Sequence, residues 1–202
     1  MAFSEEIAKR IAEKHCNNDD ERGLDTSFAN VCSFLHENKA YFSWRSKKDR
    51  PSLDNAQGLE TLAEKYFAGY RKSDFPKMPE TVPDDMVSIV MMAAFSTRME
   101  DCEKLRKDHQ KMMAAENCVG ALLERYLDSV LRQNGWHWCC GSLVKAVDFL
   151  KRNKKGKWQI LQIKNRDNSE NSSSSAIRDG KPIEKWFRTF SRTGETNWDN
   201  LP

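Results

Sequence analysis

The stretch Val144–Asp167, VKAVDFLKRNKKGKWQILQIKNRD, decides the fold that this sequence predicts. Apolar residues dominate its first part as far as Leu150, and they dominate again from Trp158 to Ile163, so each part is typical of a strand. The segment between them, Arg152–Lys157, is polar and carries a glycine near its end, as hairpin loops do. The sequence therefore predicts two antiparallel strands joined by this loop.

Three polar residues, Asp148, Gln162 and Lys164, lie inside these apolar strands. Residues two apart on a strand point to the same face, so Gln162 and Lys164 project together, and Asp148 on the neighbouring strand can face the same side. Carboxylate, amide and carbonyl oxygens suit Mg²⁺, and the Ile163 carbonyl is a third candidate ligand. Lys164 would position or help to deprotonate an attacking water and pair with a phosphate. The pattern indicates phosphodiester hydrolysis; the alternative is an ordinary amphipathic hairpin with a solvated face.

The same residues resemble a known nuclease signature. Asp148 followed by Gln162-Ile163-Lys164 resembles the PD-(D/E)xK motif in its QxK form. The runs LQIKNRDNSENSSSSAIRDG and KWFRTFSRTGETNW resemble type II restriction endonucleases of the SinI kind, which cut GG(N)CC-type sites. The resemblance covers roughly Glu116–Pro202, and none is recognised upstream. No proline precedes Asp148, and Gln162 replaces the usual acidic residue, which removes one negative charge from the metal site.

The resemblance implies an α/β fold. A PD-(D/E)xK nuclease core, a mixed sheet flanked by helices, would occupy residues 116–202, after a mainly helical part over residues 1–115. The spacing Gly120-x-x-x-Glu124 resembles the first-helix motif of these nucleases, in which a glutamate reaches toward the metal site. Glu116 is the second candidate, and two ordinary surface glutamates are the alternative.

The resemblance also implies the reaction and its partners. The reaction would be Mg²⁺-dependent, site-specific cleavage of double-stranded DNA that leaves 5′-phosphate and 3′-hydroxyl ends. A cognate DNA methyltransferase would protect host DNA, and a symmetric recognition sequence suggests a homodimer.

Charge along the chain is uneven. The net charge is +3 over 202 residues, but residues 151–192 hold twelve Lys and Arg against four Asp and Glu. That segment is therefore at +8 and the rest of the chain near −5. A basic patch beside an acidic body is typical of nucleic-acid binding; a solvated surface is the alternative.

The predicted DNA contacts follow the second strand. Residues 165–179, NRDNSENSSSSAIRD, are interpreted as a DNA-contacting loop rather than a flexible serine-rich linker. Its two arginines could read guanine in the major groove. Residues 182–192 are predicted to form a helix with its aromatic side chains inward and its basic ones toward the DNA backbone. The predicted DNA-binding residues are Asn165, Arg166, Asn168, Ser172, Ser173, Arg178, Lys185, Arg188 and Arg192.

Apolar residues at helical spacing predict helices in most of the remaining chain. Residues 86–95 are apolar nearly all round, so this helix is expected to be buried. Three prolines make residues 73–85 an extended linker. The predicted helices cover residues 4–16, a segment capped by Asp25-Thr26, a segment starting at Asp54 or Asn55, and residues 86–95, 100–115 and 116–133.

Composition excludes some classes of protein. No apolar run reaches the length of a membrane helix and the first residues lack a signal-peptide core, so a cytoplasmic protein without a membrane partner is expected. The six cysteines form no C-x-x-C pair, and reduced thiols are favoured over a metal cluster or disulfides. Two functional alternatives remain: a repair or junction-resolving nuclease of the same superfamily, and a non-catalytic DNA-binding module.

Overall fold

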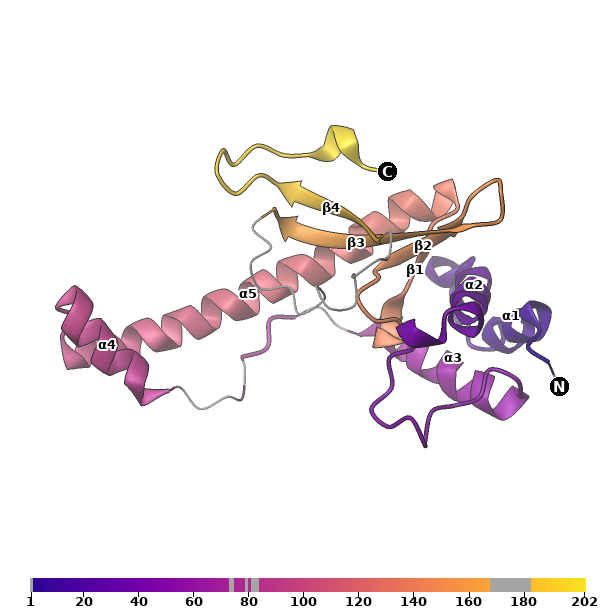
Figure 1. Ribbon diagram of the computed structural model, residues 1–202, viewed down its shortest axis with the longest axis horizontal. Helices are drawn as coiled ribbons and strands as arrows, with labels where there is room; N and C mark the ends of the chain where they lie inside the picture. The colour runs from indigo at the N-terminus through magenta and orange to yellow at the C-terminus, as the bar shows by residue number, and fades with distance from the viewer. Residues whose placement is uncertain (1, 73–74, 79, 81–83, 168–182) are drawn as a thin grey trace. The chain divides into compact units, whose positions relative to one another are not determined.

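The computed structural model describes residues 2–72, 75–78, 80, 84–167 and 183–202 (Figure 1). Their contacts divide the chain into two compact units. The first unit joins Met1–Lys72 to Glu124–Pro202, and the second is Ser73–Leu123. The functional division into residues 1–115 and 116–202 is a different partition and stays a prediction.

Three helices begin the first unit: α1 (Glu5–Glu13), α2 (Leu24–Glu37) and α3 (Ala56–Arg71). The predicted start of the third helix is confirmed, because the Asn55 side chain accepts a hydrogen bond from the Gly58 amide at 2.7 Å. The predicted cap of the second helix is wrong, since α2 begins one residue earlier behind Gly23, whose left-handed backbone (φ 84°) serves as its N-cap. The short 3-10 helices of this part are η1 (Asp19–Glu21) and η2 (Lys39–Tyr41).

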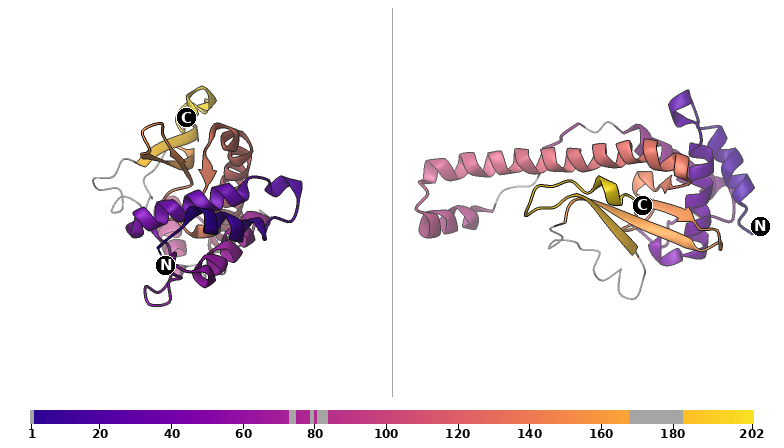
Figure 2. Two further views of the ribbon diagram at one scale, coloured as in Figure 1. Left: turned by 90° about the vertical axis from the view of Figure 1, so that its right-hand side faces the viewer. Right: turned by 90° about the horizontal axis from the view of Figure 1, so that it is seen from above.

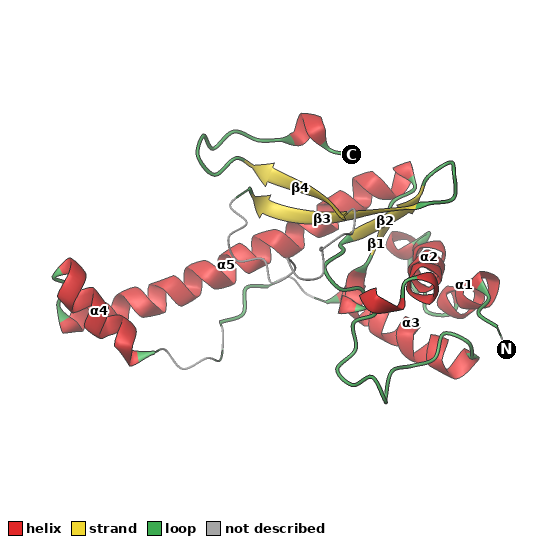
Figure 3. Ribbon diagram, in the orientation of Figure 1, coloured by secondary structure: helices red, strands yellow, loops and turns green. Residues whose placement is uncertain are grey.

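The sheet has four strands in the order β1 (His137–Trp138), β2 (Phe149–Arg152), β3 (Trp158–Arg166) and β4 (Ile183–Thr189) (Figure 3). The first two pairings are antiparallel, and β3 and β4 are parallel. The predicted hairpin between β2 and β3 is confirmed, because the Asn153 amide donates to the Lys157 carbonyl at 2.9 Å.

The predicted first strand is wrong in extent. Residues 144–148 are not regular strand: Val144 makes only one bridge, with Phe42, and Ala146 has a positive φ of 57°. A left-handed residue breaks the extended backbone, so β2 starts only at Phe149. Asp148 therefore lies just before the strand rather than inside it.

The helix predicted over residues 182–192 is also wrong, because residues 183–189 of this segment form the strand β4. Its residues alternate across the sheet, and only Trp186 is buried. The prediction turned neighbouring aromatic residues inward together, as a helix would. Parallel pairing with β3 instead sends Trp186 and Phe187 to opposite faces.

Helices α1, α2 and α3 pack beside the sheet near β1 and the first residues of β3 (Figure 2). Phe34 of α2 meets Trp158 of β3 edge-on at 5.5 Å, and the Tyr66 hydroxyl donates to the Trp138 carbonyl at 3.0 Å. A Cβ on Gly69 would lie 2.2 Å from the Gly141 Cα. This close approach of two backbones fixes the short 3-10 helix η4 (Cys140–Ser142), which leads toward Asp148, against α3.

The last turns of α5 (Met99–Leu131) and the segment after β4 complete the first unit. Leu127 and Leu131 of α5 are fully buried, and η3 (Arg132–Asn134) then ends at Gly135, whose backbone is left-handed with φ 77°. Beyond β4, a segment containing η5 (Trp198–Asn200) returns to the sheet. There Trp198 contacts Trp186, with ring centroids 5.3 Å apart.

The second unit contains α4 (Asp85–Phe95) and most of α5 (Met99–Leu131). The two helices predicted over residues 100–115 and 116–133 are one continuous helix, because no breaker residue separates them. The expectation that residues 86–95 are buried is wrong: in α4 only Ser88 is buried.

The cysteines and the hydropathy of the helices are the last features of the fold. All six cysteines are free thiols. Among the described residues, no helix is long and apolar enough to cross a membrane.

Candidate active site

Asp148 is held by its backbone on two sides. Its amide donates to the Leu161 carbonyl at 2.9 Å, and its carbonyl accepts from the Cys139 amide at 2.8 Å. Its carboxylate oxygen Oδ2 accepts from the Ile163 amide at 2.6 Å. The carboxylate therefore lies beside the part of β3 that carries the predicted motif.

The surroundings of Asp148 act on its charge in opposite directions. The pKa of Asp148 is raised to about 6, because the effect of burial exceeds the opposite effects of the hydrogen bond from Ile163 and the charge of Lys164. A cation that binds next to a buried carboxylate of this kind stabilises its charged form. Because the charge of Lys164 lowers the pKa of Asp148, the two side chains are close enough to interact electrostatically.

Gln162 supplies an unsatisfied oxygen in β3, one residue before the Ile163 amide that binds Asp148. Its side chain is 5% exposed, and its Oε1 atom is buried without a hydrogen-bond partner among the described residues. Leaving a buried carbonyl oxygen unpaired costs about 1–3 kcal/mol, and such an atom in a folded protein points to a missing water, ion or ligand. The orphaned oxygen fits a metal that prefers oxygen ligands.

The Ile163 carbonyl faces the same side of β3 as Asp148. In a strand, the N–H and C=O of one residue point to the same neighbour, and the Ile163 N–H points to Asp148. Asp148 and the Ile163 carbonyl thus lie on the same side of β3, and Gln162 is the neighbour of Ile163 in that strand. That the three oxygens bind one metal stays a prediction. No cluster of three or more His, Cys, Asp or Glu that could hold a metal occurs in the described part of the chain, so carboxylates alone do not build the site.

Lys164 and Lys185 share the face of Gln162. Lys164 lies two residues beyond Gln162 on β3, and Gln162 pairs with Lys185 of the parallel strand β4. Lys185 is exposed and Lys164 is partly exposed. The strand β4 thus adds a second cation to the face that carries the motif, which the predicted helix did not place there.

Asn165 and Arg188 lie on the opposite face. Arg188 Nε donates to Asn165 Oδ1 at 2.9 Å across the two strands. Both were predicted to bind DNA, one from a loop and one from a helix, and those two local structures are wrong. Their DNA contacts stay predictions.

The remaining predicted DNA-binding residues differ in what is described. Arg166 is exposed on the last residue of β3, so it belongs to the strand rather than to the predicted loop. Arg192 is exposed beyond β4. Asn168, Ser172, Ser173 and Arg178 lie outside the described residues.

Glu124 of α5 lies near the same segment through Trp138. Its Oε2 atom accepts from the Trp138 indole nitrogen at 3.2 Å. Burial raises the pKa of the Cys139 thiol, and the charges of Asp148 and Glu124 raise it further, so both carboxylates are near this cysteine. The residues Trp138 and Cys139 connect the two acids, and no sequence signal marked them. Glu116, the second candidate, is exposed and belongs to the other unit.

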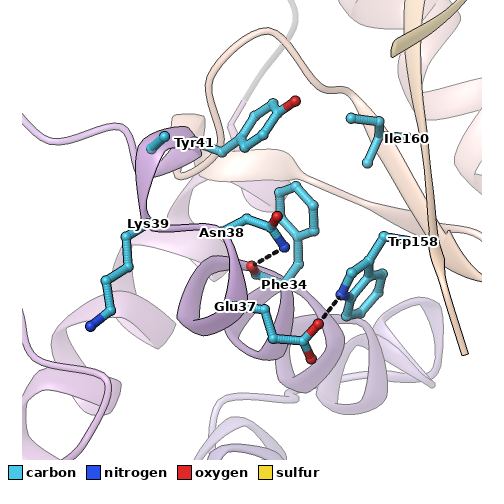
Figure 4. A pocket seen from close by; sticks show the side chains of 8 residues that line it. Phe34, Glu37, Asn38, Lys39, Tyr41, Trp158 and Ile160 are labelled. Carbon is cyan, nitrogen blue, oxygen red and sulfur yellow. Dashed lines mark hydrogen bonds between the residues drawn. The ribbon is translucent and has the colours of Figure 1, made fainter. Parts of the chain in front are cut away.

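A separate hollow lies on the same strand. It has a volume of about 370 Å³ and contains none of the predicted site residues (Figure 4). In it, the Trp158 indole donates to Glu37 at 2.7 Å and Asn38 donates to the Phe34 carbonyl at 3.0 Å. Its lining residues are Phe34, Glu37, Asn38, Lys39, Ala40, Tyr41, Trp158 and Ile160.

Comparison with known proteins gives consistent results. The sequence model of the SinI restriction endonuclease family matches residues 8–202. The chain is 46% identical over 181 residues to the type II restriction enzyme Eco47I of Escherichia coli, which covers 89% of this chain and 78% of that protein. It is 49% identical over 159 residues to the type II restriction enzyme SinI of Salmonella infantis, which covers 78% of this chain and 69% of that protein. The similarity thus extends well upstream of Glu116, where none was recognised from the sequence.

Proposed function

Since the chain belongs to the SinI restriction endonuclease family and is a type II site-specific deoxyribonuclease, we propose that Asp148, Gln162 and Lys164 form its catalytic centre. The observation that carries the proposal is the buried Gln162 oxygen, which lacks a partner among the described residues and belongs to the residue before Ile163, whose amide binds the buried carboxylate of Asp148. The substrate is double-stranded DNA with a GG(N)CC-type site. The products carry 5′-phosphates.

Asp148, Gln162 and the Ile163 carbonyl would hold a Mg²⁺ ion. When bound, such an ion stabilises charge on the phosphate oxygens and lowers the pKa of a water. The Ile163 amide fixes one oxygen of Asp148 and leaves the other oxygen of the carboxylate for the ion. Glu124 is proposed to assist from α5 by orienting groups near Cys139.

Lys164 acts on the phosphate and on the attacking water. Its ammonium lies on the face of Gln162, so it can pair with an oxygen of the cleaved phosphate and orient the water. Lys185 on the same face is proposed to contact the DNA backbone. Arg166, which is exposed where β3 ends, is proposed to read a base edge next to the cut, as arginine does with guanine.

The partners follow from this reaction. A second copy of the chain would supply the second catalytic centre for the opposite strand, and a cognate methyltransferase would modify the recognition site in host DNA. That both relatives are named type II restriction enzymes favours cleavage at a fixed sequence over a repair or junction-resolving activity.

Digestion of one plasmid of known sequence tests the proposal. With Mg²⁺, we expect cuts only at GG(N)CC-type sites, with 5′-phosphate ends that a ligase rejoins without a kinase. Ca²⁺ in place of Mg²⁺ should allow binding without cleavage. Cleavage in EDTA, cuts at other sites, or cuts that follow branched structures instead of sequence would contradict the proposal.

A further inference from the structure

Helix α4 exposes most of its apolar side chains. Its residues from Met86 to Phe95 include no charged residue. Met86 is 59% exposed, Val90 55% and Phe95 74%. The largest exposed apolar patch on a typical monomer is about 300–600 Å² and is often functional. An apolar helix of this kind is expected to be covered in the working protein.

The exposed side of α4 is the side that does not contact α5. Ser88 is the buried residue of α4, and its backbone carbonyl accepts from the Cys102 thiol of α5 at 3.8 Å. Asp85 pairs with Arg106 of α5 at 3.0 Å, so Ser88 lies on the side of α4 that faces α5. Residues two positions from Ser88 lie about 200° around the helix from it. Val90 and Met86 are those residues, so they point away from α5.

Helix α5 carries a matching apolar row. Leu105, Met112 and Val119 follow one another at intervals of seven residues and are 46%, 63% and 39% exposed. A seven-residue repeat of apolar residues is the pattern by which helices pack side by side. Neither helix of this unit therefore covers the apolar row of the other.

The second unit has almost no core of its own. Among its described residues only Ser88, Cys102, Ala114 and Leu123 are buried. Two antiparallel helices form a stable bundle when two more helices cover their apolar sides. The unit therefore lacks the partner helices that would complete it.

Charge argues against nucleic acid as this partner. Residues 73–123 hold nine Asp and Glu against six Lys and Arg, whereas residues 151–192 are at +8. Several charges of α5 are already paired within the helix, as in Lys107–Glu103 at 2.8 Å and Lys111–Asp108 at 3.0 Å. A DNA backbone would be repelled from a unit whose net charge is negative.

The amount of apolar surface fits a second copy of the chain. Fully burying one such side chain removes roughly 60–120 Å² of apolar surface from water. The half-exposed apolar side chains of the two helices together offer several hundred Å², on the order of one side of a standard interface. A two-fold axis would bring two such helix pairs into one bundle of four helices.

We propose that the unit formed by α4 and α5 is the dimerisation surface, on which two chains assemble a four-helix bundle through the exposed apolar rows around Val90 and Met112. The link to cleavage of both DNA strands rests on the proposed function, because each chain has one catalytic centre. The surface itself rests only on exposure, spacing and charge.

Mass measurement by light scattering, without DNA or metal, tests the proposal on the full chain. We expect the wild type at about twice the chain mass of 23.4 kDa at micromolar concentration. Val90→Glu and Met112→Glu should each weaken dimerisation about a hundredfold or more, because each buries two unpaired charges near the symmetry axis. Because no DNA is present, the result does not depend on whether the proposed catalytic centre is correct.

Lys107→Glu is the matched control. It adds negative charge on the side of α5 that lies opposite Leu105 and Met112, and it should leave the dimer intact. A second measurement covers variants that fold poorly: amide exchange in α4 of the wild type should speed up on dilution. A monomeric wild type whose α4 amides stay protected at every concentration would overturn the proposal in favour of packing within one chain. A dimer that both glutamate variants leave unchanged would also overturn it.

Discussion

The polar side chains on the two faces of the β3–β4 pair differ in whether their hydrogen bonds are satisfied within the protein. On one face, Gln162 has a buried oxygen without a partner among the described residues, with Lys164 and Lys185 beside it. On the other face, Arg188 and Asn165 satisfy each other at 2.9 Å.

The face of Asn165 also carries buried apolar residues that pack within the protein. Ile163 and Trp186 pair with each other across the strands on the face of Asn165, and both are buried. There the Trp186 indole donates to the Asn197 carbonyl at 3.1 Å, so the chain end completes this face. On the face of Asn165, the polar groups named here therefore find partners within the protein. The face of Gln162, the unfinished face, carries a buried oxygen that has no partner among the described residues. This difference favours the unfinished face as the one that receives metal and phosphate.

The largest expected effect concerns Asp148. Asp148→Asn keeps the shape of the side chain and an oxygen for the Ile163 amide, but removes the charge that a divalent cation needs. We expect cleavage of a cognate duplex to fall below detection while binding in Ca²⁺-free buffer stays within a few fold. Quenched single-turnover assays measure the rate.

Asp167→Asn is the control for this change. Asp167 directly follows β3, and its carboxylate accepts from the Ser191 amide at 2.7 Å, so it already has a hydrogen-bond partner within the protein. Its substitution should leave the cleavage rate near that of the wild type. If Asp148→Asn cleaved as fast as Asp167→Asn, the unfinished face would not be the catalytic one.

The next effect concerns Lys164. An ammonium that stabilises charge only in the transition state contributes on the order of 3–4 kcal/mol, so Lys164→Ala should slow cleavage roughly a hundredfold to a thousandfold. Lys164→Arg should not restore the rate, because the guanidinium has another geometry and does not deprotonate. Lys157→Ala, an exposed lysine of the hairpin loop, should have little effect. A fully active Lys164→Arg variant would show that Lys164 contributes only its positive charge and no specific geometry or proton transfer.

A smaller effect is expected for Lys185. It is exposed on the face of Gln162, so it should contact a phosphate rather than a base. Lys185→Ala should weaken binding to cognate and random duplexes alike and reduce the slope of log K against log salt by about one. A salt series in Ca²⁺ measures both. A loss confined to the cognate duplex would instead place Lys185 at a base.

The sequence predicted the central hairpin because its signals are local. Two short segments rich in apolar residues and the polar turn around Gly156 specify two paired strands without help from the rest of the chain. The spacing of Gln162 and Lys164 then fixes their common face, since the side-chain period of a strand is two. The sequence did not predict the backbone conformation of Ala146. Its positive φ delays the start of β2 to Phe149, so Asp148 lies just before the strand.

The errors came from segments whose structure depends on distant partners. Residues 183–189 are a strand because β3 offers them a parallel edge, and nothing within the segment states that such an edge exists. Helix α4 has the composition of a buried helix, and the structure leaves it exposed. That Trp138 and Cys139 link Glu124 to Asp148 also depends on contacts between segments far apart in the sequence.

The smallest effect is expected for Arg188, and it tests the comparison from the other side. If the face of Asn165 is complete, Arg188→Ala removes one internal hydrogen bond, worth about 0.5–1.5 kcal/mol of folding free energy, and changes DNA affinity and salt slope little. Thermal unfolding and the same salt series measure the two quantities side by side. Asn165→Ala and the double variant close a mutant cycle, in which a coupling of similar size would confirm that the two side chains serve each other. If Arg188→Ala instead weakened binding to all DNA and lowered the salt slope by about one, Arg188 would contact a phosphate, and both faces of the β3–β4 pair would take part in holding DNA.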